Sequence, residues 1–193
     1  CCGSLDLHLG DAEKATAAIK RNIDALFPLV DVVEGIVSTA SGCGVTVKDY
    51  GRILADDLEY ADRAKTLSAK TYDVSEYLHQ ANLPLTAKQP SQAIAWHPPC
   101  SLQHGQKITG VVEELLEGAG YNLVPVADSH LCCGSAGTYS VLQYERSQAL
   151  RQLKLDSLLE ADPEVIVTAN VGCQSHLAAG TSRPVLHWIE MLK

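Results

Sequence analysis

The chain repeats a cysteine motif, and this repeat constrains the fold more than any other feature. Cys-Cys-Gly-Ser occurs at residues 1–4 and again at 132–135. A second motif closes each copy, as IVSTASGC at 36–43 and as IVTANVGC at 166–173. The two motifs recur after 131 and 130 positions, so a gap of one residue aligns both copies. The chain is therefore predicted to contain two related structural units.

Each copy predicts the same order of elements after its Cys-Cys-Gly turn. An amphipathic helix comes first, since apolar residues recur at helical spacing. Its predicted apolar positions are Ala18, Ile19, Ile23 and Leu26 in the first copy and Leu150, Leu153, Leu155, Leu158 and Leu159 in the second. A β-branched pair then predicts a buried parallel strand, Ile36-Val37 or Ile166-Val167. Each strand leads into a small-residue turn with one cysteine, Cys43 or Cys173.

Residues 93–100, AIAWHPPC, supply the front half of the second copy. They predict a strand over 93–96 and a proline-stiffened turn that carries Cys100. A helix over 107–117 and a strand over 121–126 are expected to follow. Alternating strands and helices indicate an α/β fold with a parallel sheet. The counterpart of Cys100 would precede residue 1, so the fold class is two pseudo-repeated Rossmann-like βα units, the first truncated at its N-terminus.

The domain organisation follows from the same alignment. Residues 1–80 are expected to form the C-terminal part of the first repeat, with two helices between 49 and 80. Residues 81–92, ANLPLTAKQPSQ, contain two prolines and few large apolar groups, which is typical of a linker. Residues 93–193 are expected to form the complete second repeat.

The composition excludes several classes of function. The 193 residues carry a net charge of −8 and no cluster of Lys and Arg, which argues against binding nucleic acid or an anionic membrane surface. No apolar run reaches the roughly 18 residues of a membrane span. At most peripheral membrane association is expected. Seven cysteines, an odd number, argue against a closed set of disulfides and favour metal or redox chemistry.

Four cysteines of the second copy form the main candidate site: Cys100, Cys132, Cys133 and Cys173. Each is placed at a strand-to-helix turn, and such turns lie at one edge of a parallel sheet. Four converging thiolates would repel one another, and a metal centre relieves this repulsion. Vicinal cysteines fit a tetrahedral zinc poorly but can bind different irons of a cluster, so an iron–sulfur centre is the better chemical match. Gly134 is expected to adopt a positive φ and free backbone N–H groups for sulfur.

Two alternatives to a metal centre stay open on the residues alone. The four thiols could be buried as small hydrophobes, or they could perform thiol–disulfide exchange. Cys1, Cys2 and Cys43 form a weaker second set, because one ligand is missing from the chain. His176 follows Cys173 by one helical turn and is a further candidate ligand.

The motifs WHPPCSLQHGQ, HLCCGSAGTY and TANVGCQSHL resemble the cysteine-rich CCG domain family over nearly the whole chain. This family includes lactate utilisation protein A, the glycolate oxidase iron–sulfur subunit and the component of heterodisulfide reductase that carries this domain. The residues around the motifs are most similar to the glycolate oxidase member, with LADDLEYADRAKTLSAKTYDVSEYL and VLHWIEML as further matches.

The resemblance implies a ligand set. The family pattern is Cys, then Cys-Cys-Gly, then Cys-x-x-Cys, and Cys100, Cys132, Cys133 and Cys173 match its first four cysteines. The fifth position holds His176 in the second copy and Thr46 in the first. With four thiolates rather than five, an ordinary [4Fe–4S] cluster is the implied cofactor.

The resemblance also implies a role. It is that of a non-catalytic iron–sulfur subunit that passes electrons from a flavin-containing glycolate or related 2-hydroxy-acid dehydrogenase toward a quinone-type acceptor. A ferredoxin-type N-terminal region would be absent from these residues, and the location would be cytoplasmic or on the inner face of the membrane. The rival functions are a heterodisulfide or quinone reductase with a catalytic cluster, and a non-redox cysteine or zinc scaffold.

Overall fold

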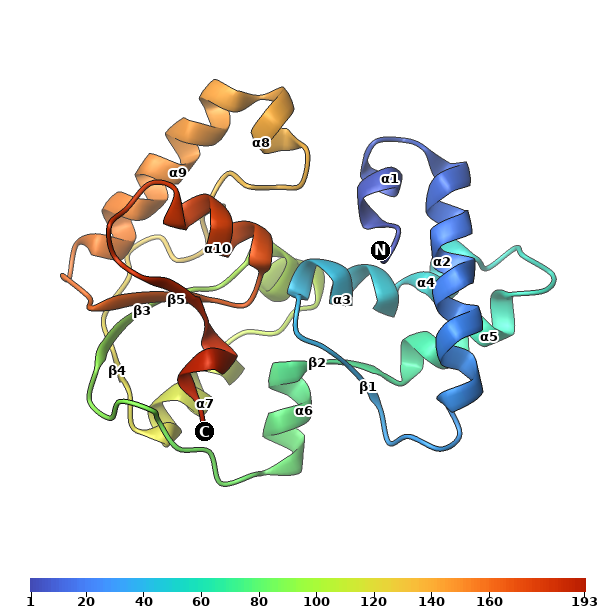
Figure 1. Ribbon diagram of the computed structural model, residues 1–193, viewed down its shortest axis with the longest axis horizontal. Helices are drawn as coiled ribbons and strands as arrows, with labels where there is room; N and C mark the ends of the chain where they lie inside the picture. The colour runs from blue at the N-terminus through green and yellow to red at the C-terminus, as the bar shows by residue number, and fades with distance from the viewer. The chain divides into compact units, whose positions relative to one another are not determined.

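The computed structural model describes all residues, 1–193, and the chain divides into two compact units (Figure 1). Unit 1 comprises Cys1–Tyr77 and unit 2 comprises Leu78–Lys193. Every strand pair in the two sheets is parallel, so the predicted α/β class with parallel sheets is confirmed. None of the helices combines the length and the hydrophobicity that crossing a bilayer requires.

Unit 1 has a two-stranded parallel sheet, β1 (Ile36–Ser38) beside β2 (Thr71–Asp73). Its buried core is formed by the apolar faces of its helices, with Ile19, Ile23, Tyr50, Leu54, Ala64 and Leu67 at the centre. The helices are α1 (Ser4–His8), α2 (Ala12–Leu26), α3 (Ser41–Lys48), α4 (Tyr50–Ile53) and α5 (Ala61–Ala69), with a 3-10 turn, η1 (Phe27–Leu29). The boundary between the units falls within α6 (Val74–Ala81).

Unit 2 has a four-stranded parallel sheet in the order β4-β3-β5-β6. Its strands are β3 (Ala93–His97), β4 (Asn122–Leu123), β5 (Val165–Thr168) and β6 (Val185–His187). Its helices are η2 (Ser101–Gly105), α7 (Val111–Ala119), α8 (Tyr139–Leu142), α9 (Tyr144–Leu159), α10 (Val171–Ala178) and η3 (Trp188–Met191). In Figure 1, α9 and α10 lie on one side of this sheet and α7 on the other.

The strand order places a topological switch point between β3 and β5. The chain runs from β3 outward to β4, returns across β3 to β5, and continues outward to β6. In open α/β sheets the crevice at the carboxyl ends of the strands on either side of such a point is where ligands are bound. Ala95 and Ile166 pair in register on the face that packs on Leu155, Leu158 and Leu177, and His97 and Thr168 are the next pair along that face.

The observed elements differ from the predicted ones at several places. The strands β2 and β6 were not predicted, because each is only three residues long and lacks a continuous β-branched run. The helix expected over 107–117 begins at Val111, after Gly110 at φ +80°.

The predicted apolar position Leu153 is wrong, since this residue is 59 % exposed. The helix turns that position to solvent and buries Lys154 instead.

The segment expected to be a linker, 81–92, lies within unit 2. Ala87 is buried and pairs with Leu192 in an isolated antiparallel bridge. The main chains of Thr86 and Lys193 also exchange hydrogen bonds in both directions. This segment therefore packs along the C-terminal end of the unit, and the exact domain boundaries stay a prediction.

Gly134→Ala is expected to destabilise the protein strongly, by about 2–4 kcal/mol. Gly134 has φ +89°, and an added Cβ would lie 2.5 Å from the Ser147 carbonyl oxygen and 3.0 Å from Leu150 Cβ. Gly110→Ala is the matched control, because Gly110 has φ +80° with nothing within 4 Å. The control should lose only about 1–2 kcal/mol from backbone strain. Urea unfolding of the metal-free protein measures both losses, and equal losses would contradict the packing argument.

Candidate metal centre

Cys100 is presented by the turn that follows β3. Pro98 and Pro99 have no N–H to donate, and they separate the strand from η2, which is a single turn of π-helix. Such π-turns concentrate at functional sites. The turn is closed by main-chain bonds from Leu102 and Gln103 to the Pro99 carbonyl, at 2.9 and 3.0 Å. Cys100 is thereby placed at the carboxyl end of β3, half-buried.

Cys132 and Cys133 lie in the loop that follows β4. The Gly134 N–H donates to Cys132 Sγ at 3.3 Å, and the positive φ of Gly134 makes this geometry possible. The Ser147 hydroxyl of α9 donates to the Gly134 carbonyl at 2.8 Å and fixes the loop. Cys132 is half-buried and Cys133 is buried.

Cys173 lies in the first turn of α10, three residues after Asn170. Asn170 Nδ2 donates to Cys173 Sγ at 3.6 Å. The N-terminal turn of a helix favours negative charge, which stabilises the thiolate form. The turn that was predicted to carry this cysteine is therefore a helix start, and Cys173 is buried there.

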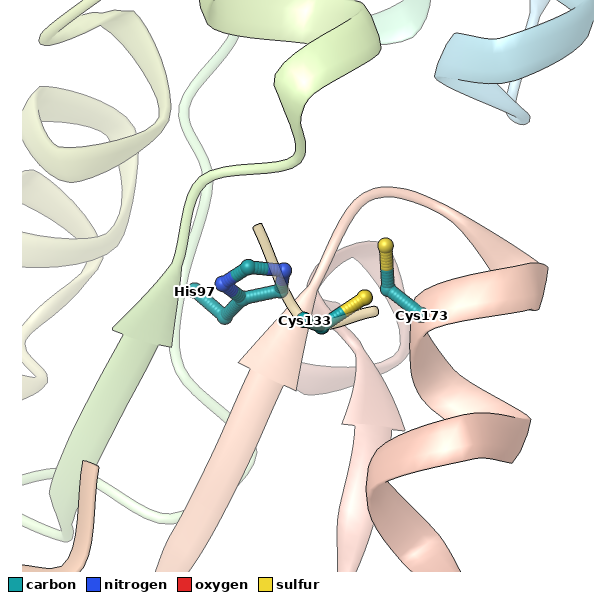
Figure 2. A group of neighbouring side chains, drawn as sticks. All are labelled: His97, Cys133 and Cys173. Carbon is teal, nitrogen blue, oxygen red and sulfur yellow. The ribbon is translucent and has the colours of Figure 1, made fainter. Parts of the chain in front are cut away.

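The four thiols of unit 2 meet in one place. Hydrogen bonds link Cys100 to Cys132, Cys132 to Cys133, and Cys133 to Cys173. The ligand atoms of Cys133, Cys173 and a histidine, His97, all lie within 4.8 Å of one another. Figure 2 shows His97 at the tip of β3 and Cys173 at the start of α10, with Cys133 between them. Thiols from cysteines that are separated by 31 and 39 residues in the sequence thus lie together at the switch point.

The shared pocket separates the thiols into two protonation states. Hydrogen bonds donated by Cys100 and Cys133 hold the pKa of Cys132 far below its ordinary value. The hydrogen bond from Cys133 lowers the pKa of Cys173 to about 5, although burial opposes the shift. The same bonds, with burial, raise the pKa values of Cys100 and Cys133. At neutral pH the metal-free pocket therefore holds two thiolates, each stabilised by a neighbouring thiol.

His97 is the histidine of this group, and it was not predicted as a site residue. It is fully buried, and neither ring nitrogen has a partner at ordinary hydrogen-bond distance. It lies close enough to Cys173 to help lower the pKa of that thiol. An unpaired buried imidazole is costly unless it meets a ligand or a charged group. The alternation of side chains along a strand could have predicted this position. Ala95 and His97 face the same side of the sheet, and His97 is the last residue of β3, where ligands are held.

His176, the further candidate ligand, has a different neighbour. Its Nε2 lies 3.2 Å from the Ser147 hydroxyl and 3.4 Å from the Ser147 carbonyl oxygen. It therefore contacts the same serine that fixes the Gly134 carbonyl. His97, rather than His176, is the histidine grouped with Cys133 and Cys173.

The weaker set in unit 1 is only partly assembled. A hydrogen bond from Cys43 lowers the pKa of Cys2 to about 6, and the same bond raises the pKa of Cys43. The Tyr50 hydroxyl donates to the Cys2 carbonyl at 2.8 Å. Cys1 and Cys43 are exposed. Two thiols thus meet here, and no histidine or carboxylate completes a metal-binding group around them.

The family model of the cysteine-rich domain, CCG, matches residues 1–48 and 94–178. These two ranges contain all seven cysteines and cover most of the chain. The chain belongs to the CCG cysteine-rich domain family. The two matched ranges correspond to the two repeats found in the sequence.

Three relatives extend the comparison within the CCG family. The chain is 45 % identical over its whole length to the glycolate oxidase iron-sulfur subunit of Escherichia coli, of which it covers 48 %. It is 32 % identical over 95 % of its length to the probable glycolate oxidase iron-sulfur subunit of Bacillus subtilis, covering 41 % of that protein. It is also 30 % identical to lactate utilization protein A of Geobacillus thermodenitrificans, covering 82 % of it. The chain thus spans a little under half the length of the two glycolate oxidase relatives.

The donor set of this CCG chain suits an inorganic centre of soft character. Thiolates select zinc, copper(I) and iron–sulfur clusters, and metal binding removes the remaining thiol protons. The orphaned nitrogens of His97 give the pocket a further unused donor. The pocket therefore fits a metal centre better than it fits a packed apolar core.

Cys132 is expected to be the first thiol of unit 2 to react with iodoacetamide in the metal-free protein. Its lowered pKa keeps it a thiolate at pH 5, where Cys100 and Cys133 are protonated, and Cys173 is buried. The rate at Cys132 should change little between pH 5 and 8, because the thiolate is already formed. Peptide mass spectrometry after timed alkylation measures each site.

Cys2 provides the internal comparison for this labelling. Its pKa of about 6 predicts a rate that rises through pH 6 and then levels off. A Cys132 rate that instead climbs steadily up to pH 8.5, as an ordinary thiol would, contradicts the assigned protonation states.

Proposed function

We propose that the chain is the cysteine-rich part of an iron–sulfur electron-transfer subunit in a complex that oxidises a 2-hydroxy acid. The convergence of Cys100, Cys132, Cys133 and Cys173 at the switch point of unit 2 is the observation that carries the proposal. The names of its relatives, iron-sulfur subunits of glycolate oxidase and a lactate utilization protein, support the same role. When bound, an iron–sulfur cluster supplies reversible one-electron chemistry.

The four cysteines are proposed as the cluster ligands. Cys132 and Cys173 are already poised as thiolates, while Cys100 and Cys133 release their protons as iron binds. Adjacent Cys132 and Cys133 would bind different irons, which a [4Fe–4S] cluster provides. His97 would approach the site from β3 as a hydrogen-bond donor to sulfur, for which its unpaired nitrogens are suited.

The complex proposed around the chain has three further parts. A flavin-containing dehydrogenase subunit would oxidise glycolate and deliver electrons, and a quinone-type molecule would accept them. A ferredoxin-type region would complete the subunit, in keeping with relatives about twice as long as the chain. The chain itself would turn over no substrate and would lie in the cytoplasm or at the inner face of the membrane through its complex.

A single zinc ion is the second candidate, and one distance favours it. Ligand atoms of His97, Cys133 and Cys173 within 4.8 Å of one another are close to the spacing around one ion, since tetrahedral Zn–S bonds of about 2.3 Å place ligands about 3.8 Å apart. In that case the unit is a scaffold without redox function. His97→Ala separates the two cases, because it should weaken zinc affinity at least tenfold in the scaffold and leave iron uptake largely intact in the electron carrier.

Anaerobic reconstitution with iron and sulfide is expected to load about one cluster per chain. Replacing any one of Cys100, Cys132, Cys133 or Cys173 by serine should reduce iron and sulfide content by more than half, because a hydroxyl is a poor ligand for iron. Metal and acid-labile sulfide analysis measures both contents. Cys43→Ser is the matched control, since the thiols of unit 1 are incomplete. Zinc bound in place of iron, or equal loss in the control, would refute the proposed site.

A further inference from the structure

Lys154 is a buried lysine that the proposed ligand set does not use. It lies on α9 between exposed Leu153 and buried Leu155, and none of its surface is exposed. Its ammonium donates to the main-chain carbonyls of Asp128, at 3.1 Å, and Ser129, at 2.9 Å. Burial lowers its pKa, because a charge removed from water is destabilised. A buried ammonium is therefore expected only where negative charge lies nearby.

The loop bound by Lys154 leads directly into the cysteine pair. Asp128 has φ +47°, and the Leu131 N–H donates to the Asp128 carbonyl at 3.0 Å, immediately before Cys132. On the other side of the pair, Ser147 of the same helix holds the Gly134 carbonyl. Ser147 and Lys154 are seven residues apart, so they share one face of α9. This face holds the Cys-Cys-Gly loop at both ends.

Three of the proposed ligands are among the groups whose negative charge, once they are ionised, acts on Lys154. Cys100, Cys133, Asp128 and Cys132 all act to raise its pKa against the effect of burial. Three of these four groups belong to the proposed ligand set. The ammonium is thus positioned to offset the negative charge of the sulfur pocket.

Unit 1 offers a natural comparison at the equivalent position. Its glycine turn at Gly3 packs on Ala15 of α2 as Gly134 packs on Ser147 of α9. Seven residues later α2 carries Asn22, where α9 carries Lys154. The Asn22 amide donates to the Cys1 carbonyl at 2.8 Å, which is a carbonyl of the cysteine pair itself. The unit with two meeting thiols thus has a neutral donor, and the unit with four has a cation.

We propose that Lys154 is a positioning residue that anchors the Cys132-Cys133 loop and supplies the fixed positive charge of the sulfur site. The proposal rests on the proposed iron–sulfur function. One-electron reduction adds a negative charge to the site, forms no bond and needs no proton. A fixed cation favours the reduced state and raises the reduction potential.

The test compares Lys154→Met, which keeps side-chain length and removes the charge, with Lys154→Arg and the control Lys88→Met. Lys88 is an exposed lysine of the same unit, so its replacement removes the same charge from the surface. The midpoint potential is measured in the whole reconstituted chain by a mediated titration with dithionite as electron donor, followed by electron paramagnetic resonance. We expect the equilibrium constant for one-electron reduction to be at least tenfold smaller in Lys154→Met than in the wild type. This corresponds to a downward shift of about 59 mV in the midpoint potential. Lys154→Arg should restore most of the potential, and equal potentials in Lys154→Met and Lys88→Met would overturn the proposal.

Loading and hydrogen exchange cover the remaining outcomes. If Lys154→Met takes up no iron, uptake by Lys154→Arg supports the role of the charge, and failure of both variants overturns it. If the wild-type chain takes up no cluster, the proposed function is refuted. The anchoring role of Lys154 is then tested by hydrogen exchange in the metal-free protein. There, Lys154→Met should speed amide exchange of Leu131 at least tenfold over Lys88→Met, and an unchanged rate would overturn the anchoring role.

Discussion

Four sulfur atoms are forced together at the carboxyl ends of two neighbouring parallel strands, and the rest of unit 2 accommodates the charge that results. The turns that follow parallel strands all lie at one edge of the sheet. From β3 the chain adds β4 on one side and then β5 and β6 on the other, and this change of side leaves a crevice for a ligand at that edge. The turns after β3 and β5 carry Cys100 and Cys173, and the loop after β4 brings the vicinal pair to the same place. In the metal-free state the pocket limits repulsion by keeping two protons on Cys100 and Cys133.

The residues around the thiols position them and stabilise their negative charge. Gly134 adopts the backbone conformation that turns its N–H onto Cys132, and close packing on Ser147 leaves no room for a larger residue. Asn170 donates to Cys173, and the start of α10 adds the favourable end of a helix dipole. His97 and Lys154 are a buried imidazole and a buried ammonium that an apolar pocket would not tolerate. Polar burial of this kind is consistent with a charged centre.

The sequence was sufficient for features that depend on periodicity and repetition. The duplicated motifs predicted the βα order, the parallel sheet and the cysteines that meet, because a fixed strand direction leaves few places for the turns to go. It was insufficient for short strands such as β2 and β6, whose pairing depends on neighbours distant in the chain. Lys154 was missed because a lysine within an amphipathic pattern is normally assigned to the solvent face. The place of His97 in the site could not be predicted, since its burial depends on packing of the complete sheet edge.

X-ray absorption spectroscopy of the anaerobically reconstituted protein tests the central claim most directly, because it reports which element occupies the thiol pocket and which atoms surround it. The account predicts an iron edge with a shell of sulfur atoms and a second shell of neighbouring iron. A zinc edge with mixed nitrogen and sulfur ligands, or iron bound without sulfur, would contradict it.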